Sequence, residues 1–128
     1  VRAKVAMIAW CRRQKLPVVV AGGAGAQSDP SRIRLDDLSR TEQDPLLARV
    51  RSQLRKEHGF TRDPKKKFGI PVVYSAEPVR PPATGAACET GGVHGGLNCA
   101  GFGSSVCITA TFGLFAAAAA LGLIQEKA

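Results

Sequence analysis

The residues best placed for chemistry in this 128-residue sequence form a glycine-rich segment directly after an apolar run. Residues 17–21 read PVVVA, and Gly22, Gly23 and Gly25 follow within four positions. α/β proteins often hold a phosphate where a strand runs into such a segment. The spacing does not fit the dinucleotide fingerprint GxGxxG, because Ser28 stands where the third glycine is required, and no Gly-Lys-Ser/Thr follows. We therefore predict a loop that lines a ligand crevice through close backbone approach, without a nucleotide grip of its own.

Three further side chains are candidates for nucleophilic or acid–base chemistry. Cys99 lies between glycines before the last apolar segment, where the positive end of a helix would lower the pKa of a thiol. A catalytic thiol and a small packing residue are both open interpretations there, whereas Cys107, inside that segment, is predicted to lie in the core. His94 is either a general base or an ordinary loop histidine, and Glu77 either faces the crevice or simply ends a strand.

The four cysteines, Cys11, Cys88, Cys99 and Cys107, are irregularly spaced and include no CxxC pair. Structural zinc sites usually bring their ligands in closely spaced pairs, so we predict no zinc or other metal on this chain. Irregular thiols without a secretory signal are typical of reduced proteins, which predicts a cytoplasmic location.

Positive charge is concentrated in the first half of the sequence. Residues 1–67 carry 16 Lys and Arg against 7 Asp and Glu, whereas the remainder carries 2 against 3. This asymmetry favours an anionic partner such as nucleic acid, with a merely solvated basic face as the alternative. The candidate contacts to an RNA backbone are Arg12, Arg13, Lys15, Arg49, Arg51, Arg55, Lys65, Lys66 and Lys67.

Helix and strand patterns alternate along the first 75 residues. Apolar spacing predicts a helix over 1–15, whose buried face we expect Trp10 to extend. A strand buried on both faces is expected over 17–21, and one with a solvated face over 32–35. Asp44 and Pro45 then predict the start of a second helix. Gly59 would end it as a left-handed cap, an exposed basic turn would follow over 61–67, and a strand over 71–75.

The last third of the sequence has two parts. Residues 79–100 are rich in Pro, Gly and Thr without periodicity, which predicts a long irregular loop. Residues 103–124 carry no charge and include five consecutive alanines, which predicts an apolar helix. Because alanine gives little drive for insertion, we expect a buried core or interface helix rather than a membrane span.

Several ordered segments together resemble one enzyme family over nearly the whole chain. They are Arg2 and Lys4, residues 11–13 (CRR), the glycine loop with Asp29 and Pro30, residues 37–38 and 44–46, and residues 72–77 (VVYSAE), 98–105 (NCAGFGSS) and 109–113 (TATFG). In these segments the sequence resembles the C-terminal part of bacterial tRNA threonylcarbamoyladenosine dehydratases, within the superfamily of ubiquitin-activating-type adenylating enzymes.

The resemblance implies a fold and an activity. The fold would be α/β, the C-terminal half of a Rossmann-like adenylating domain with a mixed sheet flanked by helices, spanning residues 1–128. The activity would be ATP-dependent dehydration of threonylcarbamoyladenosine in tRNA through ligase-type adenylation of its carboxylate. ATP and Mg²⁺ would be bound by a half upstream of Val1, so we expect the chain to be part of a longer protein, inactive alone.

The resemblance also implies partners: tRNA, a second copy in a homodimer, and a sulfur-acceptor or cysteine desulfurase system. Three alternatives stay open. They are an RNA-binding module without catalysis, a relative that activates sulfur carriers, and a protein anchored in a membrane by its last helix.

Overall fold

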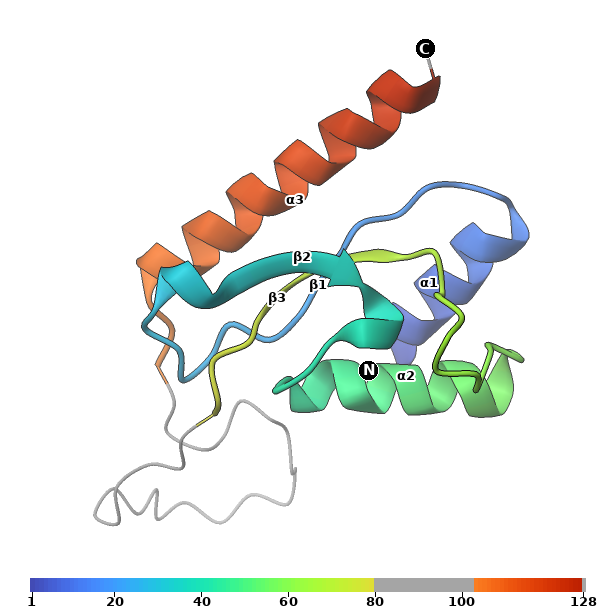
Figure 1. Cartoon of the computed structure of the whole chain (residues 1–128), viewed down its shortest axis with the longest axis horizontal. Helices are drawn as coiled ribbons and strands as arrows, with labels where there is room; N and C mark the ends of the chain where they lie inside the picture. The colour runs from blue at the N-terminus through green and yellow to red at the C-terminus, as the bar shows by residue number, and fades with distance from the viewer. Residues whose placement is uncertain (80–102, 128) are drawn as a thin grey trace.

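The structure, a computed structural model, describes residues 1–79 and 103–127 (Figure 1). Helices and short strands alternate along this part of the chain. In order, the elements are α1 (Arg2–Arg13), β1 (Val20–Ala21), η1 (Pro30–Arg32), β2 (Ile33–Asp37), η2 (Leu38–Arg40), α2 (Pro45–Glu57), β3 (Pro71–Ser75) and α3 (Val106–Lys127), where η marks a 3-10 helix.

The three strands form one mixed sheet in the order β1-β3-β2. β1 runs parallel to β3, with Val20 opposite Val72, and β2 runs antiparallel to β3, with Ile33 opposite Ser75. The predicted fold class, an α/β arrangement with a mixed sheet flanked by helices, is therefore confirmed.

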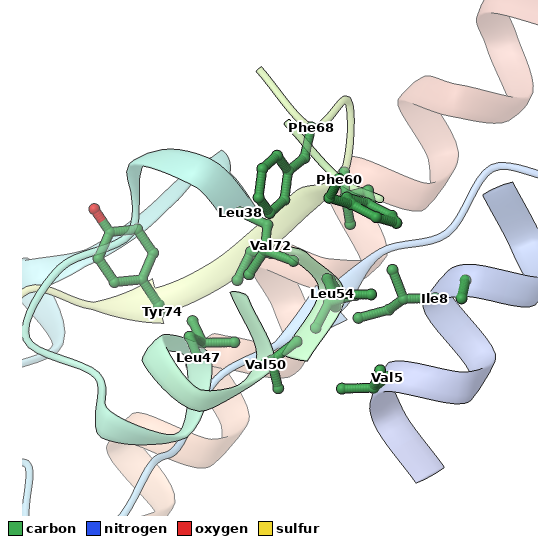
Figure 2. Packing of buried hydrophobic residues seen from close by; sticks show 13 residues of the cluster. Val5, Ile8, Leu38, Leu47, Val50, Leu54, Phe60, Phe68, Val72 and Tyr74 are labelled. Carbon is green, nitrogen blue, oxygen red and sulfur yellow. The ribbon is translucent and has the colours of Figure 1, made fainter. Parts of the chain in front are cut away.

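The central strand β3 sends alternate side chains into two cores, as the pleat of a strand requires. Val72 and Tyr74 pack with α1 and α2 on one face of the sheet (Figure 2). Val73 packs on the other face, with Ile108 and Phe112 of α3. The described residues thus form three layers, with the sheet between the α1–α2 pair and α3 (Figure 1).

Local sequence signals explain both ends of α2. Asp44 is its N-cap and accepts a hydrogen bond from the backbone N–H of Leu47, while Pro45 occupies the first turn. Gly59 follows the helix with φ +66°, a conformation that costs glycine little. Both predicted ends of this helix are confirmed.

Two expectations about the first elements need correction. Trp10 does not extend the buried face of α1 but is 50% exposed, because the face that meets α2 is centred on Val5, Ile8 and Ala9. The first strand is shorter than predicted: only Val20–Ala21 pair with β3, while the preceding valines lead into the strand half-buried.

The last helix differs most from its prediction. It runs over Val106–Lys127 rather than 103–124, and only Ile108 and Phe112 of it are buried. Of the predicted alternatives, a core or an interface helix, the core position is thus wrong for most of its length, and so is the core position of Cys107, which is exposed. By length and composition alone α3 could cross a membrane, with a mean hydropathy of 2.1. The irregular loop predicted over 79–100 lies, after Val79, outside the described residues.

Candidate functional site

The glycine loop leaves the carboxyl end of β1 and is fixed there by Asp44. This carboxylate is 5% exposed, and Oδ2 accepts a hydrogen bond of 2.8 Å from the N–H of Gly23 while Oδ1 caps α2. A Cβ on Gly22 would lie 2.2 Å from Oδ2 of Asp44. Glycine is therefore required at this position because the carboxylate packs directly onto the backbone. One acid joins the loop to the start of α2.

Lys4 of α1 lies beside the same strand end. Its Nζ donates a hydrogen bond of 2.5 Å to the carbonyl oxygen of Ala21, the residue before the first glycine. Burial lowers the pKa of Lys4, and the negative charge of Asp44 partly offsets this shift. The sequence drew attention to Lys4 only through the family resemblance, because a lone lysine in a helix gives no sign of a contact 17 residues away.

Glu77, just after β3, holds the far end of the loop. Its carboxylate accepts hydrogen bonds from the N–H groups of Ser28 (3.1 Å) and Asp29 (3.0 Å). The bond from Asp29 and those from Ser28 hold the pKa of Glu77 below its usual value, against the opposing effect of burial. Glu77 is therefore an anchor of the loop, a role that the sequence analysis did not consider.

The loop also contacts the start of α3. Gly25 pairs with Ser104 in an isolated β-bridge, and the N–H of Ala26 donates to the carbonyl of Gly103 at 3.2 Å. The N–H of Gly22 donates to Val73 of β3 at 2.8 Å. Gly22 and Gly23 are thus half-buried between β3 and the start of α2, whereas Gly25, at the approach to α3, is exposed.

This environment decides what the loop can bind. The N–H groups of Gly22, Gly23, Ala26, Ser28 and Asp29 already donate to protein oxygens, so they are not available to cradle a phosphate. Within residues 1–79 and 103–127 there is also no cluster of three His, Cys, Asp or Glu side chains that could hold a metal. The glycine loop therefore does not offer these five N–H groups to the phosphates of a nucleotide.

The basic candidates separate into two groups in the structure. Arg12, Arg51 and Arg55 have partners within the protein: Arg12 donates to the carbonyl of Phe68, Arg55 to that of Thr61, and Arg51 to the hydroxyl of Thr41. Arg12 is nevertheless exposed, as are the remaining candidates, which form the second group: Arg13, Lys15, Arg49, Lys65, Lys66 and Lys67. The candidates Cys99 and His94 lie outside the described part of the chain.

These features define the class of protein: an α/β chain whose mixed sheet ends in a glycine loop that carboxylates hold in place.

No family model matches the chain. A tRNA threonylcarbamoyladenosine dehydratase of Haemophilus influenzae is 46% identical over 128 residues, which are 99% of this chain and 48% of that protein. The enzyme of the same name from Escherichia coli is 43% identical over 133 residues, 100% of this chain and 50% of that protein.

A solved structure supports the same relationship. The crystal structure of the E. coli dehydratase in complex with ATP matches with a TM-score of 0.77 and 39% identity, over 97% of this chain and 44% of that one. By sequence and by fold, the chain is related over its whole length to the tRNA threonylcarbamoyladenosine dehydratases. It spans about half the length of the curated relatives that it matches.

Proposed function

We propose that this chain acts as the sheet-completing part of a longer tRNA threonylcarbamoyladenosine dehydratase. The observation that carries the proposal is 46% identity along 99% of the chain to an enzyme of that name. The reaction would be the ATP-dependent loss of one water from the threonylcarbamoyl group, which closes a ring on the modified adenosine. When bound, ATP would transfer AMP to an oxygen of the substrate carboxylate with release of pyrophosphate, and AMP would then leave with that oxygen when the ring closes.

We assign ATP and Mg²⁺ to a preceding segment of the same enzyme. This assignment agrees with the occupied N–H groups of the glycine loop and with the half-length match to the relatives. The part of the present chain is then to complete the sheet and to border the crevice with Gly22, Gly23 and Gly25. We propose Cys99 as the catalytic thiol of this reaction.

A chimera tests the proposed activity. The chain replaces the matching segment of the E. coli dehydratase in a strain that lacks the native enzyme, and tRNA nucleosides are analysed by mass spectrometry. We expect the modified adenosine to become lighter by one water, as in the control strain carrying the unaltered E. coli enzyme. A folded, ATP-binding chimera that leaves the nucleoside at the heavier mass would contradict the proposal.

The same chimera with Cys99→Ser should lose dehydration activity. Unchanged dehydration activity would show that Cys99 is a packing residue.

A second candidate function is RNA binding without catalysis, favoured by the exposed lysines at residues 65–67. The same chimera separates the two functions, since a binding module would retain tRNA affinity and fail to remove water.

We also propose that the protein is a cytoplasmic homodimer that uses α3 as an interface helix. Leu114, Leu121 and Ile124 are 71%, 61% and 66% exposed, and a second copy would remove this apolar surface from water. Leu114→Glu with Leu121→Glu should convert the dimer to monomer in sedimentation experiments, whereas Gln125→Glu, on the same helix, should not. Recovery of the unaltered protein in the membrane fraction would favour the membrane-anchored alternative. We also propose a sulfur-acceptor or cysteine desulfurase system as a partner, and co-purification with the protein would test this.

A further inference from the structure

Residues 62–67, between α2 and β3, form an exposed basic turn. Arg62, Lys65, Lys66 and Lys67 place four cations on it, and all of these side chains are exposed. The turn has internal order, because Asp63 accepts two hydrogen bonds within it. Its side-chain Oδ1 accepts from the N–H of Lys65 at 2.9 Å, and its backbone carbonyl accepts from the N–H of Lys66 at 3.1 Å. A local Asx turn of this kind fixes the backbone that carries the lysines.

An arginine from α2 holds the first end of the basic turn. The Nε of Arg55 donates to the carbonyl of Thr61 at 3.2 Å. Its guanidinium lies over the ring of Phe68, 5.3 Å from the ring centroid. Arg55 thereby connects the residue before the turn to the residue after it.

An arginine from α1 holds the second end. Nη1 of Arg12 donates to the carbonyl of Phe68 at 3.2 Å, and its guanidinium lies 4.3 Å from the centroid of Phe60. The two phenylalanine rings meet edge to face at 5.0 Å and are buried in the core (Figure 2). Asp37 completes this end by accepting from the N–H groups of Phe68, Gly69 and Ile70.

We infer that the basic turn is a preformed contact for the sugar–phosphate backbone of RNA, and that Arg12 and Arg55 position the turn without contacting phosphate. This inference rests on the proposed tRNA substrate. Each guanidinium has one N–H on a backbone carbonyl and one face on a ring, whereas the ammonium groups of Lys65, Lys66 and Lys67 extend into solvent. Two of the earlier RNA-contact candidates thus become positioning residues.

The contact would gain from being fixed before RNA arrives. Lysine is a compact point charge that recognises phosphate without reading the base, so the turn would not select a sequence. Each neutralised phosphate releases condensed counterions, and a turn that is already ordered has less entropy to lose on binding. Lys15 lies near the second end of the turn, because Lys15, Arg12 and residues 68–71 line one pocket of about 220 Å³.

The first test removes the charge of the turn. Labelled tRNA is titrated against the complete protein that contains this chain, at several salt concentrations. A triple Lys→Gln variant at residues 65–67 should make the negative slope of log K against log[salt] shallower by about 2–3. Each lost phosphate contact changes this slope by about 0.7–0.9. The matched control removes three exposed charges elsewhere, with Arg34→Gln, Arg40→Gln and Lys56→Gln, and should change the slope by less than about 1.

The second test keeps the charge and removes the positioning. Arg12→Lys retains a cation but loses the planar stack on Phe60, and Phe60→Leu retains Arg12 but removes the ring. Both variants should speed amide hydrogen exchange over residues 62–68 and weaken tRNA binding severalfold. If Arg12 instead contacts phosphate directly, Arg12→Lys would bind tRNA nearly as the unaltered protein does, with unchanged exchange, and this role would be overturned.

The outcomes separate this inference from the proposed function. If the unaltered protein binds no tRNA, the proposed substrate fails and the RNA contact fails with it. If the protein binds tRNA and the triple variant matches its control, only the basic turn is refuted. Loss of binding to phosphatidylserine vesicles by the triple variant, with tRNA binding intact, would assign the turn to a lipid surface and overturn the RNA contact.

Discussion

Replacement of Asp44 by alanine should destabilise the protein more than any other single change at the glycine loop. The substitution removes the N-cap of α2, which costs about 1 kcal/mol. It also leaves the N–H of Gly23 without an acceptor, which costs about 1–3 kcal/mol if the group stays buried. The two losses together are roughly 2–4 kcal/mol, a large part of the stability of a small domain.

The assay is equilibrium unfolding in urea, with the free energy taken from the midpoint at constant slope. Asp44→Asn should lose about half as much, because one oxygen can still cap Leu47 while its amide nitrogen faces the N–H of Gly23. Asp29→Ala is the matched control: it removes a comparable cap, on η1, from the protein surface and should cost less. If the free energy of unfolding of Asp44→Ala lies within about 0.5 kcal/mol of that of the unaltered protein, the carboxylate does not hold the loop.

Two further predictions concern the same region. Gly22→Ala should cost about 1–3 kcal/mol because its Cβ would overlap the Asp44 carboxylate, whereas Gly25→Ala, with open space around it, should stay within about 0.5 kcal/mol in the same assay. Asp37 gives a pH dependence. Burial raises its pKa, but hydrogen bonds from Ser39, Phe68 and Ile70 outweigh that effect and hold the folded pKa below the unfolded value of about 3.9. The carboxylate thus stabilises the fold above that value, and this contribution is lost as pH falls through the folded pKa. The thermal unfolding midpoint of Asp37→Asn should therefore fall less between about pH 5 and 2 than that of the unaltered protein. An equal fall in both proteins would contradict the stabilising role of the Asp37 carboxylate.

The sequence predicted those parts of the fold that local signals determine. Asp44, Pro45 and Gly59 mark the ends of α2 within a few residues, so capping chemistry alone locates the helix. The α/β class follows from the alternation of patterns and is present in the structure. The failure at Cys107 and along α3 has a different origin. Apolar composition indicates that a surface avoids water, but it does not indicate whether the same chain, a second copy or a lipid covers that surface.

The candidate site was predictable only in its backbone. The glycines follow β1 as expected, but their reason lies in Asp44, some 20 residues further along, and no local pattern links the two. The contacts of Lys4 and Glu77 with the loop likewise depend on strand order and on helix packing.

The charges show the same distinction with a functional consequence. The sequence offered no reason to rank the nine candidate phosphate ligands against one another, since a sequence shows a charge but not its partner. Arg12 and Arg55 each stack on a ring and donate to a backbone carbonyl, and both of these partners flank residues 62–67. A cation that is hydrogen-bonded to the backbone of its own protein contributes order, whereas a cation that extends into solvent contributes affinity. Positive charge in this chain therefore divides into a part that builds the surface and a part that remains free to meet an anion.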